Sequence, residues 1–188
     1  MRGKEVYLAE LRAGDSELFA QWQWDEAFMQ GISEDVFHPF NIDDWEKMFS
    51  DTMSNEDFYF TIRRTMNDQL IGFISLTNVY FKNRHGAIGI GIPHAENRGK
   101  GYGTEAIELL LAFAFDHLGL HKVRLSVHEF NQKALNVYKK IGFVQEGVNR
   151  ESVYKSGKWY DQIDFGLLQT EWRINENNKI RRFERDLG

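Results

Sequence analysis

Two hydrophobic patterns alternate along this chain and predict its secondary structure. Short apolar or alternating runs are typical of strands, whereas apolar residues three or four apart are typical of helices. The strand pattern occurs at 6–11, 58–62, 70–76, 86–92, 122–127, 143–154 and 159–168. The helix pattern follows Asp15, begins again at Asn41, and recurs over 105–117 and 131–141. This order of elements predicts an α/β (α+β) fold with a sheet of mixed direction.

The same pattern gives no sign of a second domain. The chain has 188 residues, only two prolines and no low-complexity linker, so we expect residues 1–170 to form a single domain around one core. The helix over 105–117 is apolar nearly all round, which predicts that it is mostly buried. Residues 171–188 form a polar tail, which we expect to be a loosely held helix.

Composition and charge narrow the classes of function. A net charge of −5 gives no general attraction to nucleic acid or to an anionic membrane, and no apolar run is long enough to span a bilayer. The chain has no cysteine, and its His, Asp and Glu residues show no convincing metal spacing. We therefore expect a cytoplasmic protein with no metal and with no nucleic-acid or membrane partner.

The stretch Asn97–Thr104 joins a predicted strand to a predicted helix and carries glycines at 99, 101 and 103. Glycines let the backbone approach a bound group closely, and a helix start offers free N–H groups and the positive end of a dipole. A Walker loop is excluded because Lys100 is followed by Gly101, and the dinucleotide spacing is also absent. The stretch is either a phosphate site or a tight turn that starts the helix.

A second pattern, N-x-x-A-x-x-x-Y-x-K-x-G-F, runs from Asn131 to Phe143. Together with Arg98-x-x-Gly101-x-Gly103, it resembles the signature of the GNAT N-acetyltransferases, and the resemblance covers about residues 5–170. The segments 146–151 and 160–168 look like the RimJ/RimL-like and spermidine acetyltransferase branches. The resemblance implies a twisted, mostly antiparallel sheet of about seven strands, flanked by helices and splayed between the fourth and fifth strands.

The resemblance also implies acetyl-CoA as the co-substrate. In this family the glycine loop holds the pyrophosphate, and the preceding strand pairs with the pantetheine arm through backbone groups. The residues that match are Ile90, Gly91, Ile92, Arg98, Gly99, Lys100, Gly101, Tyr102, Gly103, Thr104 and Asn131. Arg98 and Lys100 would otherwise be solvated charges. Asn131 would otherwise be an ordinary N-cap, a role compatible with a pantetheine contact.

Tyr138 matches the family position from which a tyrosine donates to the departing sulfur. It lies two helical turns after Asn131, about 10 Å along the axis. A tyrosine is protonated at neutral pH, but full transfer to a thiolate is uphill by roughly 2 kcal/mol, which favours partial transfer or a relay. The alternative is a core aromatic residue on an amphipathic helix.

An amine attacks a thioester only when it is neutral, so a proton acceptor is expected. The strand position at which the ribosomal S18 alanine acetyltransferase carries a glutamate is Ser126 here. The base is left open among four residues, each of which could instead be an ordinary surface residue: His85, His128, Glu129 and Glu151.

The function implied is acetyl transfer from acetyl-CoA to a primary amine, which would be a protein N-terminal α-amine, a polyamine or another small amine. The alternative is an acyl-CoA-binding sensor module without turnover. The aromatic and acidic segment 22–45 is where the family builds its acceptor wall, and carboxylates at Asp25, Glu26, Glu34 and Asp35 would suit a cationic acceptor. A homodimer is a further expectation.

Overall fold

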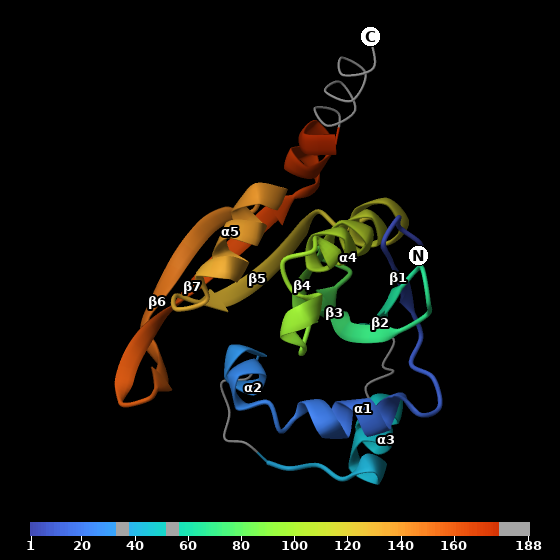
Figure 1. Ribbon diagram of the computed structural model, residues 1–188. Helices are drawn as coiled ribbons and strands as arrows, with labels where there is room; N and C mark the ends of the chain where they lie inside the picture. The colour runs from blue at the N-terminus through green and yellow to red at the C-terminus, as the bar shows by residue number, and fades with distance from the viewer. Residues whose placement is uncertain (33–37, 52–56, 177–188) are drawn as a thin grey trace.

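A seven-stranded sheet runs through the computed structural model, which describes residues 1–32, 38–51 and 57–176 (Figure 1). The strands are β1 (Val6–Ala9), β2 (Phe58–Arg64), β3 (Leu70–Tyr80), β4 (His85–Gly91), β5 (Lys122–His128), β6 (Val144–Lys155) and β7 (Lys158–Leu168). Their order is β1-β2-β3-β4-β5-β7-β6, with β4–β5 the one parallel pair. The mixed, mostly antiparallel sheet expected from the resemblance is confirmed.

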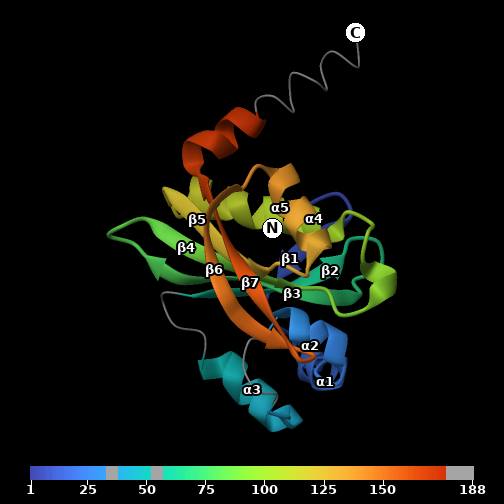
Figure 2. The same cartoon turned by 90° about the vertical axis from the view of Figure 1, so that its left-hand side faces the viewer.

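Helices cover the two faces of this sheet (Figures 1 and 2). On one face lie α1 (Asp15–Trp22), α2 (Glu26–Ile32) and α3 (Ile42–Asp51). On the other lie α4 (Tyr102–Ala112) and α5 (Gln132–Ile141), side by side in both views. A short 3-10 helix, Ala95–Asn97, precedes α4, and one π-helical turn, Phe113–His117, continues it. We refer to these faces as the α1–α3 face and the α4–α5 face.

The predicted strands and helices are present, with two differences that have a physical cause. The helix α2 was not expected; the carboxylate of Asp25 accepts a hydrogen bond from the Phe28 N–H at 2.9 Å and so starts it. The helix α4 begins at Tyr102, three residues before the predicted start, because Gly101 adopts a left-handed φ of 88° and serves as its N-cap.

The main core lies between the sheet and the helices α4 and α5. Of residues 102–117, only Asp116 and His117 are exposed, so the predicted burial of this helix is confirmed. A smaller cluster on the α1–α3 face contains Phe19, Trp22, Phe28 and Leu70, packed against Phe73 of β3. The two clusters fix the sheet from both sides.

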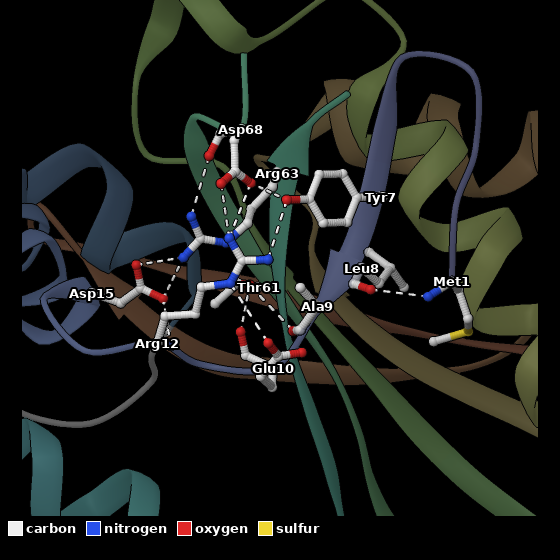
Figure 3. Close-up of polar contacts among 10 residues, drawn as sticks. All are labelled: Met1, Tyr7, Leu8, Ala9, Glu10, Arg12, Asp15, Thr61, Arg63 and Asp68. Atoms are coloured by element: carbon white, nitrogen blue, oxygen red, sulfur yellow. Dashed lines mark hydrogen bonds and ion pairs between the residues drawn. The ribbon is translucent and has the colours of Figure 1, made fainter. Parts of the chain in front are cut away.

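A buried ion pair fastens α1 to the sheet (Figure 3). The guanidinium of Arg63 on β2 contacts both carboxylate oxygens of Asp15 at 2.6 Å, and each residue is only 6% exposed. Asp15 also accepts the N–H of Arg12 at 2.8 Å, and the backbone oxygen of Asp68 accepts a hydrogen bond from Arg63. Because both charges are buried, each depends on its partner for compensation.

The chain turns into a further helix over residues 169–176 after β7. Trp172 is 4% exposed and packs in the main core, with its ring 6.3 Å from that of Phe115. The described part of the C-terminal tail is therefore anchored rather than loosely held. Across the described ranges, no helix combines the length and the apolar character needed to cross a bilayer.

Candidate active site

The strands β4 and β5 separate after three residue pairs. They are paired at His85–Lys122, Gly86–Val123 and Ala87–Arg124. Beyond that point β5 stays paired with β7 along all seven of its residues, and β4 stays paired with β3 as far as Gly91. The predicted splay is thus confirmed. From Ile88 onward, the edge of β4 that faces β5 has no strand paired with it among the described residues.

The glycine loop stands at the end of β4 and opens toward free space. Gly99 and Gly101 have φ values of 74° and 88°, and a Cβ added at either position would meet no atom within 4 Å. No side chain caps the first turn of α4. The N–H groups of its first residues lack helical partners by geometry, so this end of α4 is suited to an anion.

Two of the predicted loop residues, Tyr102 and Gly103, hold the start of α4 in place by packing and are not exposed. A Cβ on Gly103 would lie 3.4 Å from Cδ1 of Ile92 and 3.9 Å from Cδ1 of Ile90, so a small residue here brings α4 close to the end of β4. Tyr102 is 6% exposed, and the Arg64 guanidinium lies 5.7 Å from the centre of its ring. Both residues therefore fix the position of the helix start.

The charged residues of the loop behave differently from one another. Arg98 folds back, and its guanidinium donates to the backbone oxygens of Ile92, at 2.8 Å, and Pro93. Lys100 is exposed and Thr104 is half-buried. Arg98 is thus a brace that ties the loop to the end of β4, and Lys100 is the cation available at the loop surface.

Asn97 is a polar residue of this loop whose burial gave no signal in the sequence. It is 4% exposed, and its amide Nδ2 has no hydrogen-bond partner within the described part of the chain. A buried amide without a partner is costly and rare in native proteins. The amide Nδ2 of Asn97 is therefore a buried donor that the described residues leave unsatisfied.

The helix α5 begins as predicted. The side chain of Asn131 accepts a hydrogen bond from the Ala134 N–H at 3.2 Å, and Gly142 ends the helix with a φ of 114°. The N-cap interpretation of Asn131 is confirmed, whereas its contact with a pantetheine arm stays a prediction.

Tyr138 is buried on the α4–α5 face. It is 9% exposed, and its ring lies 5.9 Å from that of Phe143 and 6.4 Å from that of Phe165. Its hydroxyl has no hydrogen-bond partner within the described residues, and desolvation by burial raises the pKa of Tyr138 to about 12. The group is thus a firmly protonated donor in apolar surroundings.

The structure separates the four candidate bases. His85 opens β4 opposite Lys122, four residues before the level of Ser126, which is about 13 Å at 3.3 Å per residue and too far for a direct proton transfer there. The Glu129 carboxylate accepts the N–H of Asp161 at 3.1 Å, and the Glu151 N–H donates to the Asp161 carboxylate at 2.9 Å. His128 is buried at the end of β5, with its ring 5.1 Å from that of Phe130. The Glu151 contact involves only its backbone N–H, and these contacts single out none of the four residues as the base.

A different carboxylate lies beside Ser126. The hydroxyl of Ser126 donates to Oδ1 of Asp164 on β7 at 2.7 Å, and the side-chain amide of Asn149 on β6 donates to Oδ2 at 2.8 Å. Sequence reasoning missed Asp164, because it is 38 residues from Ser126 and only the strand register brings the two together. The one hint in the sequence was that Ser126 stands where the ribosomal S18 alanine acetyltransferase carries a glutamate, which suggested that the base lies elsewhere.

The carboxylates expected along the acceptor wall have been placed only in part. Asp25 caps α2, and Glu26 is exposed in the first turn of that helix. Glu34 and Asp35 lie outside the described residues. Trp22 of α1 donates to Nε2 of His94 at 3.1 Å, which links the α1–α3 face to the segment that enters the glycine loop.

Comparison with known proteins identifies relatives over most of the chain. Residues 5–144 match the family described as acetyltransferase (GNAT) domain. The chain is 31% identical over 166 residues to YdaF of Bacillus subtilis, provisionally named a ribosomal N-acetyltransferase, which covers 88% of this chain and 86% of that protein. It is 27% identical over 169 residues to the spermidine N(1)-acetyltransferase of Vibrio cholerae, with coverages of 89% and 95%.

A solved structure agrees with these matches. The spermidine N-acetyltransferase of Vibrio cholerae in complex with CoA and spermine superimposes with a TM-score of 0.80 at 26% identity. The superposition covers 89% of this chain and 98% of that one. The shared fold therefore extends through nearly all of the described elements.

Proposed function

This chain belongs to the GNAT acetyltransferase family, and on that premise we propose that it acetylates a small primary amine with acetyl-CoA as donor. The N-acetyltransferase activity follows from the family and from relatives that carry that name across most of the chain. These relatives are named as transferases, so turnover is favoured over a sensor without catalysis. The residue roles below are our proposals for how this chain performs the reaction.

The site for the pyrophosphate is the glycine loop. The pyrophosphate would accept hydrogen bonds from the backbone N–H groups at 99–104 and from the exposed Lys100, in the open space that Gly99 and Gly101 preserve. The Nδ2 of Asn97, which has no hydrogen-bond partner among the described residues, supports a polar group being bound at this loop. Arg98 would act by bracing the loop, because its guanidinium is already held by two carbonyls.

The pantetheine arm would enter the gap between β4 and β5. There it would take the place of the lost strand partner and pair with the backbone groups of Ile90, Gly91 and Ile92, while Asn131 stands at the start of α5. The side chains of Ile90 and Ile92 instead pack toward Gly103. The observation that carries the proposal is the splayed strand edge beside an open anion loop, because this combination suits a long, amide-containing ligand.

Tyr138 would stabilise the sulfur that leaves. Acetyl-CoA supplies an activated acyl group whose leaving group is a thiolate. With the pKa of Tyr138 raised to about 12 and a thiol near 8.5, complete proton transfer to the sulfur would cost about 5 kcal/mol. The hydroxyl therefore acts as a hydrogen-bond donor to the thiolate, which is the partial transfer expected from the sequence.

The acceptor is the part of the function on which the relatives divide. A small amine is favoured by the spermidine N(1)-acetyltransferase of Vibrio cholerae and by its structure with CoA and spermine. The 31% identity with YdaF favours a second candidate, the α-amine of a protein N-terminus. A homodimer stays a prediction.

Thiol release from acetyl-CoA tests the proposal, with spermidine, spermine, simple diamines, amino acids and N-terminal peptides offered separately. We expect release that depends on a small amine and a product that mass spectrometry shows to be N-acetylated. Release with N-terminal peptides alone would select the second candidate. Binding of acetyl-CoA without release for any amine would contradict the proposal.

A further inference from the structure

We propose that Asp164 is a catalytic residue that takes the proton of the acceptor amine, with Ser126 and Asn149 as its positioning residues. The inference rests on the proposed N-acetyltransferase function and names a proton acceptor outside the four sequence candidates.

Asp164 lies at the level where the sheet opens. It is the register partner of Ser126 on β5, and Ser126 comes two residues after Arg124, the last β5 residue paired with β4. Directly opposed side chains of an antiparallel pair lie on the same face of a sheet. The Asp164 carboxylate therefore lies one strand away from the gap, at the height where β4 and β5 begin to separate.

Asp164 and Tyr138 lie on opposite faces of β7. Phe165 is 1% exposed, belongs to the main core and has its ring 6.4 Å from that of Tyr138, so it points to the α4–α5 face. The preceding residue of an extended strand points the other way. A group in the gap would thus have a proton donor on one face of the sheet and a carboxylate on the other.

Two neutral donors from the two neighbouring strands hold this carboxylate. Ser126 donates to Oδ1 at 2.7 Å and Asn149 donates to Oδ2 at 2.8 Å, so the group is oriented by neutral donors, and no described residue forms an ion pair with it. By strand alternation, the ionisable neighbours on this face are Arg124 and His128 on β5. Glu146 of β6 is also there, since its carboxylate lies against Gly166, and Lys122 neutralises it at 2.6 Å.

The proton balance fits this arrangement. The acceptor loses one proton to solvent and attacks as a neutral amine; the C–N bond forms and the C–S bond breaks. The nitrogen becomes acidic as it shares its lone pair, and its second proton passes to Asp164 and then to water. The sulfur leaves as a thiolate held by the Tyr138 hydroxyl. The products are an N-acetyl amine, CoA and the released protons.

The test compares Asp164→Asn with Glu146→Gln, a carboxylate on the same face that is neutralised by Lys122 and lies where β5 is still paired with β4. We expect kcat/KM for the amine to fall about 10²- to 10⁴-fold in Asp164→Asn and to stay within about twofold in Glu146→Gln. Affinity for acetyl-CoA should be unchanged in both. Equal kcat/KM in Asp164→Asn and wild type would overturn the proposal.

The pH profile separates a catalytic role from a structural one. In the wild type, kcat/KM should fall with the second power of proton concentration at the acidic end, once for the amine and once for Asp164; in Asp164→Asn it should fall with the first power only. In Ser126→Ala, kcat/KM should fall about tenfold while its dependence on proton concentration keeps the wild-type slope, since the change only loosens the Asp164 carboxylate. Equal slopes in Asp164→Asn and wild type would exclude the proton acceptor, even if the rate drops through misfolding.

The outcomes also separate this inference from the proposed function. If the wild type releases no thiol with any amine, the transferase proposal itself fails. If the wild type is active and Asp164→Asn matches it, only the assignment of Asp164 fails.

Discussion

At the scale of single residues, the role of the Tyr138 hydroxyl can be tested by removing a single oxygen atom. Replacing it by Phe removes the hydroxyl and keeps the ring contacts with Phe143 and Phe165. We expect kcat to fall about 10²-fold while the acetyl-CoA dissociation constant changes less than about twofold. Tyr154→Phe, at an exposed hairpin position, is the matched control. A Tyr138→Phe enzyme with the wild-type kcat would remove the hydroxyl from the reaction.

The buried hydroxyl also predicts a loss of stability at high pH. The pKa of Tyr138 is about 12 in the folded chain because of burial, against about 10 when unfolded, so the folded state holds this proton more tightly. Its contribution is complete below about pH 10 and is lost as pH rises from about 10 to 12, a change of roughly 2–3 kcal/mol. Urea unfolding at both ends of this window, in wild type and Tyr138→Phe, measures it. The decline should be smaller in the variant by that amount, and equal declines would contradict the shifted pKa.

At the scale of elements, the turn from the glycine loop into α4 can be tested apart from its stability. Gly101 and Gly157 both have positive φ, 88° and 80°, and a Cβ at either position meets open space. Each Gly→Ala change should therefore cost a similar 1–2 kcal/mol of unfolding free energy from backbone strain. Only Gly101→Ala should weaken acetyl-CoA binding, by about tenfold, as measured by calorimetry. Equal binding by the two variants would exclude the loop as the pyrophosphate site.

At the scale of the whole molecule, the pair Asp15–Arg63 holds the α1–α3 face to the sheet. Removing the charge in Asp15→Asn leaves the Arg63 guanidinium buried without its counter-ion, which should cost about 3–5 kcal/mol. Asp68→Asn is the control, because its pair with Arg12 is exposed and should contribute at most about 1 kcal/mol. Chemical unfolding of the two variants gives the comparison. Similar losses would show that burial of the pair has no special effect.

The extent to which sequence predicts this molecule depends on how local each signal is. The N-cap at Asn131, the position of Tyr138 on α5 and the glycine stop at Gly142 are encoded within one segment, and all three were predictable. The turn into α4 was predictable as a loop but not in its start, since Tyr102 becomes helical only because Gly101 takes a left-handed conformation.

Features that depend on long-range register were not predictable. Asp164 meets Ser126 because β7 inserts between β5 and β6, a strand order that the hydrophobic pattern does not specify. Arg98 was missed for a different, local reason: it matches a phosphate-binding signature, yet its guanidinium folds back onto the backbone oxygens of Ile92 and Pro93 just after β4. The burial of Trp172 in the main core likewise follows from where the chain leaves β7.

The most direct test at this scale is thiol release from acetyl-CoA by the wild-type protein in the presence and absence of a small polyamine such as spermidine. We expect release only with the amine, at a rate that saturates with its concentration, together with one equivalent of N-acetylated amine for each thiol. Acetyl-CoA that binds but yields no thiol with any primary amine, small molecule or N-terminal peptide would contradict the assignment as an N-acetyltransferase.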